Sequence, residues 1–122
     1  MSGKKIVLAD DEPDMLEVYG ARLSLLGYNV IPAANGRDAL AQIRAQKPDL
    51  VLVDYKMPYL NGLEVAEQVK SSEELKHIPV IMLTASPGVI NLDTAEKHLI
   101  DAYLIKPFET EHLLEKIRQF IG

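Results

Sequence analysis

Short apolar runs, each closed by a polar residue or a turn, recur along the chain. The clearest is Leu50–Val53, four branched apolar residues that lead directly into Asp54 and a loop containing Pro58. An apolar run this short, followed by proline and glycine, is typical of a strand buried on both faces. Similar runs predict four further strands, at 6–9, 29–33, 78–83 and 102–105.

Apolar residues at helical spacing fill the segments that follow these runs, which predicts five helices alternating with the five strands. Pro13 suits the first position of the first helix, and Gly27 suits its end. Asn35 and Asn61 are candidate N-caps, the second in a capping box with Glu64. The residues expected on the buried faces are Leu16, Tyr19, Leu23 and Leu26, then Leu40 and Ile43, then Val65, Ala66 and Val69, then Leu92, Ala95 and Leu99, and finally Leu114, Ile117 and Ile121.

Strands separated by helices connect through right-handed crossovers and form a parallel sheet that helices cover on both faces. Pro32 lacks a backbone donor for the ladder, which predicts that the strand at 29–33 lies at an edge of the sheet. The sequence shows no repeat, linker or low-complexity segment. We therefore expect a single three-layer α/β domain over residues 1–122.

The composition, with 48% hydrophobic and 25% charged residues, is that of an ordinary globular domain. A formal net charge of −5 argues against a nucleic-acid-binding surface, which needs a basic stripe. The absence of cysteine excludes disulfides and thiolate metal sites. No apolar run approaches the roughly 20 residues of a membrane span, and Met1–Lys5 lacks the apolar core of a signal peptide. We therefore expect a cytoplasmic protein with no direct nucleic-acid or membrane partner.

Polar side chains stand at the ends of four predicted strands. Asp10 and Asp11 follow the first strand, Asp54 the third, Thr84 the fourth and Lys106 the fifth. The carboxyl ends of parallel strands share one edge of the sheet, where such folds bind their ligands. Each residue alone has an ordinary explanation, since carboxylates favour helix N-termini and turns use aspartate, lysine and proline. Their shared placement instead favours a functional site.

Three carboxylates brought together in this way call for a cation. Two carboxylates about 4 Å apart repel by roughly 4 kcal/mol at an effective dielectric constant near 20, and Lys106 supplies only one positive charge. Because oxygen atoms would be the only ligands, we expect a hard cation, Mg²⁺ or Mn²⁺ in its place. Magnesium in an incomplete cage can share its remaining positions with a phosphoryl group. The set therefore suits phosphoryl transfer, with the centrally placed Asp54 as the best candidate nucleophile.

These residues closely resemble the receiver domain of two-component response regulators, over essentially the whole chain. Each motif is weak alone, but together, in order and correctly spaced, they are specific. The resemblance implies a flavodoxin-like, doubly wound parallel sheet of five strands in the order 2-1-3-4-5, with five helices. The motifs that carry it are Asp10-Asp11, Asp54 with Met57-Pro58 and Gly62, Thr84-Ala85, and Tyr103 with Lys106-Pro107-Phe108.

The resemblance also implies a phosphoacceptor and a metal site. Asp54 would accept a phosphoryl group from a phosphohistidine on a sensor histidine kinase or a phosphotransfer protein. Asp11 would bind Mg²⁺ directly and Asp10 mainly through water, with Asp54 and the backbone carbonyl of Lys56 as further ligands. The chain would then be no enzyme in the usual sense, because it would catalyse only its own phosphorylation and dephosphorylation.

A switch is the third implication of the resemblance. Lys106 and Thr84 would contact phosphoryl oxygens, and Tyr103 would turn inward when Thr84 moves. The surface of the fourth helix, the fifth strand and the fifth helix would then change and bind a downstream protein partner or output domain. The Lys106–Pro107 peptide bond would be cis, a form that bonds preceding proline adopt at low cost.

Two alternatives stay open, and one segment departs from the receiver pattern. An aspartate-nucleophile phosphatase needs a second aspartate two residues after the nucleophile, where this chain has Lys56. A pseudo-receiver or flavin-binding module of the same fold would not need Asp10, Asp11, Asp54 and Lys106 intact. The glycine that usually precedes the aromatic residue of the fifth strand is missing from 99–102, so the turn there must be built differently.

Overall fold

The computed structural model describes residues 3–85 and 99–122. These residues form one parallel sheet of five strands in the order β2-β1-β3-β4-β5. The strands are β1 (Lys5–Ala9), β2 (Asn29–Ala33), β3 (Leu50–Asp54), β4 (Val80–Thr84) and β5 (Ala102–Ile105). The helices are α1 (Pro13–Leu25), α2 (Gly36–Gln46), α3 (Gly62–Lys70) and α4 (Thr110–Ile121).

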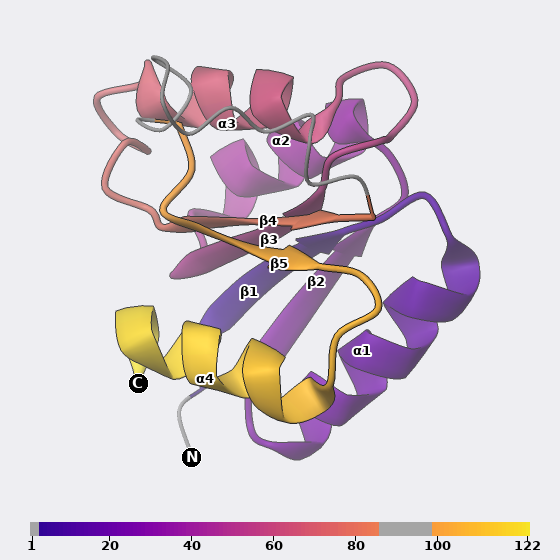
Figure 1. Cartoon of the computed structure of the whole chain (residues 1–122). Helices are drawn as coiled ribbons and strands as arrows, with labels where there is room; N and C mark the ends of the chain where they lie inside the picture. Colours follow the sequence, from indigo (N-terminus) through magenta and orange to yellow (C-terminus); the bar gives the residue numbers. More distant parts are fainter. Residues whose placement is uncertain (1–2, 86–98) are drawn as a thin grey trace.

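Helices cover both faces of the sheet, which gives the three layers expected from the sequence. Figure 1 shows α2 and α3 over one face and α1 and α4 over the other. The strand order and the flavodoxin-like architecture are therefore confirmed. The helix expected around Leu92 and Ala95 lies outside the described residues, and the helix expected last in the chain is α4.

The central strands are buried on both faces, as their continuous apolar sequences predict. All five residues of β3 are buried, and alternate side chains enter two separate clusters. Val51 and Val53 pack beneath α2 and α3, whereas Leu50 and Leu52 pack on the side of α1 and α4. This double burial fixes the register of β3 and therefore the position of Asp54 at its end.

The predicted element ends are mostly confirmed. Pro13 begins α1, and the side chain of Asn35 accepts a hydrogen bond from the backbone N–H of Asp38 at the start of α2. Asn61 and Glu64 form the predicted capping box of α3. Strand β2, which contains Pro32, lies at an edge of the sheet.

One buried-face prediction was wrong, and another was incomplete. Leu26 lies beyond the end of α1 and is 47% exposed. The backbone turns there, and the N–H of Tyr28 donates to the carbonyl of Leu23, so that Tyr28 occupies the core instead. In α4 the sequence pattern missed Leu113, which is 1% exposed, because the apolar stripe of this helix is wider than a single row.

The turn before β5 lies in the segment 99–102, which lacks the glycine usual in receivers, and it is built around Asp101. Asp101 Oδ2 accepts from the backbone N–H of Val80 at 2.7 Å and from Lys70 Nζ at 2.9 Å. The N–H of Asp101 donates in return to the carbonyl of Val80 at 2.8 Å. We call Lys70 and Asp101 the basal ion pair, since it joins the end of α3 to the first residues of β4 and β5. These hydrogen bonds show how the turn at 99–102 is held without a glycine.

None of the described helices combines the length and the apolar character needed to cross a membrane.

Candidate functional site

The polar residues predicted at the strand ends do come together. Asp54 and Thr84 are the last residues of β3 and β4, while Asp10 and Lys106 directly follow β1 and β5. Strands β1, β3, β4 and β5 pair in parallel, and their registers bring these carboxyl ends together on one side of the sheet. A cavity of about 410 Å³ opens there. It is lined by Asp11, Glu12, Asp54, Tyr55, Lys56, Thr84, Ala85 and Lys106.

Lys106 lies among several carboxylates. Its Nζ donates to Asp10 Oδ2 at 2.8 Å and lies 3.5 Å from Asp54 Oδ2. Glu12 Oε1 is 3.8 Å from the same nitrogen. We call Asp10, Asp11, Glu12, Asp54 and Lys106 together the acidic pocket. One ammonium group therefore faces three carboxylates within 4 Å, and the pocket carries an excess of negative charge.

Asp10 is fully engaged by the protein and does not line the cavity. It is 1% exposed, and its Oδ1 accepts from the backbone N–H of Glu12 at 3.0 Å while Oδ2 accepts from Lys106. Asp11 is exposed and lines the cavity. Of these two residues, therefore, only Asp11 is exposed to the cavity.

The electrostatic consequence appears at Asp54. Burial, followed by the charge of Asp10, raises the pKa of Asp54 from its ordinary 3.8 to about 6, although Lys106 opposes the shift. Burial by itself would lower the pKa of Lys106, but the hydrogen bond and the charge of Asp10 outweigh it, and the pKa is raised. Lys106 therefore stays charged, while Asp54 is a carboxylate whose negative charge is poorly compensated.

The donor set fits a hard divalent cation. Asp10, Asp11 and Glu12 can each bring one oxygen within 4.8 Å of the others, and Asp54 lines the cavity beside them. All of these donors are carboxylate oxygens, the ligands that Mg²⁺ prefers. An added positive charge would also relieve the poorly compensated carboxylate of Asp54.

Glu12 is a member of the acidic pocket that the sequence prediction left out. Glu12 follows Asp10 and Asp11 directly, but a carboxylate just before a helix is also favoured by the helix dipole, so the sequence alone does not single it out. The side chain of Glu12 is 64% exposed and reaches Lys106 only at 3.8 Å. Lys56, predicted to contribute its backbone carbonyl, lines the cavity and is exposed.

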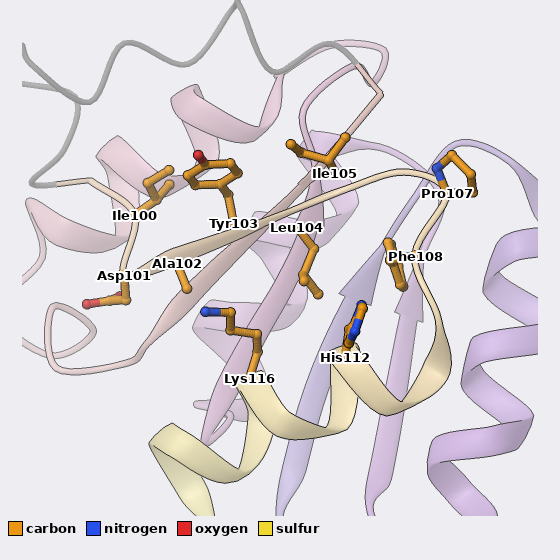
Figure 2. A pocket seen from close by; sticks show the side chains of 10 residues that line it. All are labelled: Ile100, Asp101, Ala102, Tyr103, Leu104, Ile105, Pro107, Phe108, His112 and Lys116. Atoms are coloured by element: carbon orange, nitrogen blue, oxygen red, sulfur yellow. The ribbon is translucent and has the colours of Figure 1, made fainter.

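The two predicted switch residues occupy different surroundings. Thr84 is 2% exposed and lines the cavity, and its carbonyl accepts from the N–H of Lys106 at 2.7 Å. Tyr103 is half-buried on β5 and does not line this cavity. Figure 2 shows Tyr103 on one face of β5 and Leu104 on the other, toward α4. Tyr103 instead borders a second cavity of about 730 Å³ together with Phe108, His112 and Lys116.

The loop after β5 has the conformation that the resemblance implied. The Lys106–Pro107 peptide bond is cis. The ring of Phe108 packs against Tyr19 of α1 with 5.1 Å between centroids, and Tyr19 Oη donates to the carbonyl of Phe108 at 3.4 Å. These contacts attach the loop that carries Lys106 to α1, whose first turn follows Asp11 and Glu12.

Comparison with known proteins decides the family. The model of the response regulator receiver domain matches residues 6–118. The chain belongs to the response regulator receiver family. A similar full-length relative is the polar-differentiation response regulator DivK of Brucella anthropi, which is 31% identical over 119 residues, with 98% of this chain and 97% of DivK covered.

Other curated relatives of this receiver domain are longer. The probable transcriptional regulator ycf27 of Porphyridium aerugineum is 36% identical over 99% of this chain but 49% of its own length. The phosphate regulon regulatory protein PhoB of Pseudomonas aeruginosa is 36% identical over 97% of this chain and 52% of its own length. The chain thus spans about half the length of these two relatives.

Solved receiver structures share the fold closely. The receiver domain of sensor histidine kinase PA1611 from P. aeruginosa PAO1, solved with a magnesium ion in its active site cleft, has a TM-score of 0.88 and 30% identity, with 98% of each chain covered. The response regulator TrrA of Thermotoga maritima, in complex with Mg²⁺-BeF, has a TM-score of 0.85 and 32% identity, covering 96% of this chain and 98% of that one.

Proposed function

We propose that this receiver domain is a phosphoacceptor switch in which Asp54 takes the phosphoryl group from a phosphohistidine on a sensor histidine kinase or phosphotransfer protein. One observation carries the proposal. Asp54 is a buried carboxylate that lines a cavity of about 410 Å³, and the ammonium group of Lys106 lies 3.5 Å from its Oδ2. A poorly compensated carboxylate beside a fixed cation suits a nucleophile for phosphoryl transfer.

The transfer replaces a P–N bond by a P–O bond and takes up one proton from solvent. One oxygen of ionised Asp54 forms the new P–O bond while the P–N bond of the phosphohistidine breaks. The electron pair of that bond stays on the imidazole nitrogen, which leaves as imidazole after it has taken a proton from solvent. Lys106 neutralises negative charge on the transferred group, and the Thr84 hydroxyl donates to one of its oxygens.

Magnesium is the proposed cofactor, because the oxygen donors of the acidic pocket fit it and two structural neighbours were solved with it. Asp11 and Asp54 would hold the ion, with Asp10 acting through water and the Lys56 carbonyl as a further ligand. When bound, Mg²⁺ supplies positive charge that offsets the charge of the phosphoryl oxygens. The proposal makes Mn²⁺ an acceptable substitute.

The output of the switch is proposed to run through Thr84 and Tyr103. Movement of Thr84 toward the phosphoryl group would free space for Tyr103, and the surface of β5 and α4 would change for a downstream protein partner or an output domain. Nucleic acid and membrane are not proposed as direct partners of this domain, given its net charge of −5. Its chemistry is proposed to end with its own phosphorylation and dephosphorylation.

A direct test uses a small phosphodonor. Incubation with acetyl phosphate and Mg²⁺ should add the mass of one phosphoryl group to the intact chain, and EDTA should abolish the addition. Asp54→Asn should take up none. Uptake by Asp54→Asn equal to that of the parent would overturn the assignment, whereas steady release of phosphate from generic phosphomonoesters would favour the phosphatase alternative.

A further inference from the structure

An exposed tyrosine stands in an unusual backbone conformation at the edge of the sheet that carries the acidic pocket. Tyr59 has φ +71 and is 68% exposed. The N–H of Leu60 donates to the carbonyl of Pro58 at 2.9 Å, so Tyr59 is the central residue of a γ-turn with positive φ. Bulky side chains are rare in this conformation, and glycine or asparagine would adopt it with less strain.

Neighbouring groups hold this turn and its side chain in place. The N–H of Gly36 donates to the carbonyl of Pro58 at 3.3 Å, and a Cβ on Gly36 would lie 1.9 Å from the carbonyl oxygen of Leu60. The loop before α2 and the loop before α3 are therefore in direct backbone contact. Above them, the guanidinium of Arg37 lies 4.1 Å from the centre of the Tyr59 ring.

The guanidinium of Arg37 is exposed to solvent and makes, within the described residues, only a long ion pair. Its contact with Asp38 is 3.9 Å long, and the two side chains are 65% and 57% exposed. A planar cation stacked on an aromatic ring restrains both side chains. Both side chains remain largely exposed. Their burial in the folded domain therefore does little to offset the backbone strain at Tyr59.

We propose that Tyr59 and Arg37 form a preorganised docking platform for the protein that delivers the phosphoryl group to Asp54. The proposal rests on the phosphoacceptor function proposed above and adds where the donor is recognised. Tyrosine and arginine are the residue types that most often dominate binding energy at protein interfaces. The expected complement is a partner surface with an apolar side chain for Tyr59 and a carboxylate for Arg37.

The position of the platform selects this partner. Tyr59 belongs to the segment between β3 and α3, and Tyr55 and Lys56 of the same segment line the cavity at Asp54. A donor that carries its phosphoryl group on a protein must cover the rim of that cavity before transfer. Because Tyr59 is only three residues from Lys56 and is 68% exposed, we expect such a donor to contact it, whereas a small donor such as acetyl phosphate would not.

The test compares two donors on the same variants. Autophosphorylated histidine kinases from the source genome are screened with the parent chain, and the fastest donor is used with Tyr59→Gly, Arg37→Gln and the control Leu25→Ser. Leu25 is 88% exposed at the end of α1, far along the chain from the site. Thermal melting and light scattering check the fold and the oligomeric state of every variant.

The platform predicts that Tyr59→Gly and Arg37→Gln lower kcat/KM for the kinase at least about tenfold, mostly through KM. Their phosphorylation by acetyl phosphate should equal that of the parent, Tyr59→Gly should melt no lower than the parent, and Leu25→Ser should match the parent with both donors. Equal kinase kinetics for all variants would overturn the platform. A changed oligomeric state of Tyr59→Gly or Arg37→Gln would overturn it too, as would the failure of every kinase to phosphorylate the parent. Failure of acetyl phosphate to modify the parent would instead overturn the phosphoacceptor function.

Discussion

Two lysine–aspartate pairs, one at the carboxyl ends and one at the amino ends of the strands, have nearly the same contact distance. Lys106 lies 2.8 Å from Asp10 at the edge where the strands end, and Lys70 lies 2.9 Å from Asp101 at the edge where they begin. Their surroundings differ. Lys106 is also shared with Asp54 and Glu12, so the acidic pocket has too few positive charges.

The basal ion pair is instead satisfied from every side. Besides Asp101, Lys70 Nζ donates to the carbonyl of Ile78 at 3.0 Å, and Asp101 also accepts from the N–H of Val80. Equal contact distances therefore do not mean equal roles. A pair whose charges and hydrogen bonds are complete stabilises the fold, while a set with excess negative charge favours the binding of a cation.

The largest predicted effect is a gain of stability at Asp54. Its pKa is raised to about 6, so the folded state disfavours the charged form, and a rise from 3.8 corresponds to roughly 3 kcal/mol. In EDTA at pH values well above 6, Asp54→Asn should raise the free energy of unfolding by up to this amount. Chemical denaturation of parent and variant measures the difference, and equal values would contradict the excess-charge account.

The sign of the pH dependence follows from the same shift. Between pH 3.8 and about 6 the folded chain binds a proton at Asp54 that the unfolded chain has already lost. Stability from this group is therefore present at low pH and is lost as the pH rises through about 6. Asp54→Asn should lack this component, which a series of denaturation curves in EDTA would reveal as a shallower pH profile across that window.

The second effect is a loss of stability at the basal ion pair. Asp101→Ala removes the acceptor of the Val80 N–H and the partner of Lys70, which should cost about 2 kcal/mol. Asp101→Asn retains an acceptor for Val80 and should cost about half as much. The opposite signs at Asp54 and Asp101, measured under identical conditions, are the clearest contrast between the two edges. If Asp101→Ala proved stabilising, the two sites would no longer differ in sign.

Magnesium should raise stability through the acidic pocket and not through the basal ion pair. At ten times its dissociation constant, an ion that binds only the folded state adds about 1.4 kcal/mol. The parent and Asp101→Ala should gain equally, whereas Asp54→Asn should gain less because it has lost a proposed ligand. Titration calorimetry supplies the dissociation constant, and melting curves supply the gain. An equal gain for Asp54→Asn would place the ion elsewhere.

The smallest effect is expected at Glu12. Its side chain is 64% exposed, so Glu12→Gln should change stability by no more than about 0.5 kcal/mol. Its affinity for Mg²⁺ should also stay near that of the parent, while Asp11→Asn, the matched control, should bind the ion much more weakly. Calorimetric titration of both variants decides the matter. A loss at Glu12 as large as that at Asp11 would make Glu12 a ligand.

Much of the fold and of the site could be predicted because it depends on local pattern. The continuous apolar sequence of β3 predicts double burial, Pro32 predicts an edge strand, and parallel connections bring Asp10, Asp54 and Lys106 together. Each of these inferences needs only side-chain polarity, the missing N–H of proline and the geometry of parallel strands.

The remainder depends on contacts between distant segments. That Asp101 would hold the turn before β5 by binding Lys70 and Val80 is not visible in any local pattern. The exposure of Leu26 likewise follows from where the backbone turns after α1, and the positive φ of Tyr59 from the packing of its loop against Gly36. Sequence spacing alone carries no information about such tertiary contacts.

Chemical localisation of the phosphoryl group tests the central assignment most directly. After reaction with acetyl phosphate and Mg²⁺, borohydride reduction converts the acyl phosphate to an alcohol, and peptide mass mapping locates the modified residue. Asp54 alone should be modified, in a reaction that EDTA prevents. Modification of Asp11, Glu12 or any other carboxylate, with Asp54 unchanged, would contradict it.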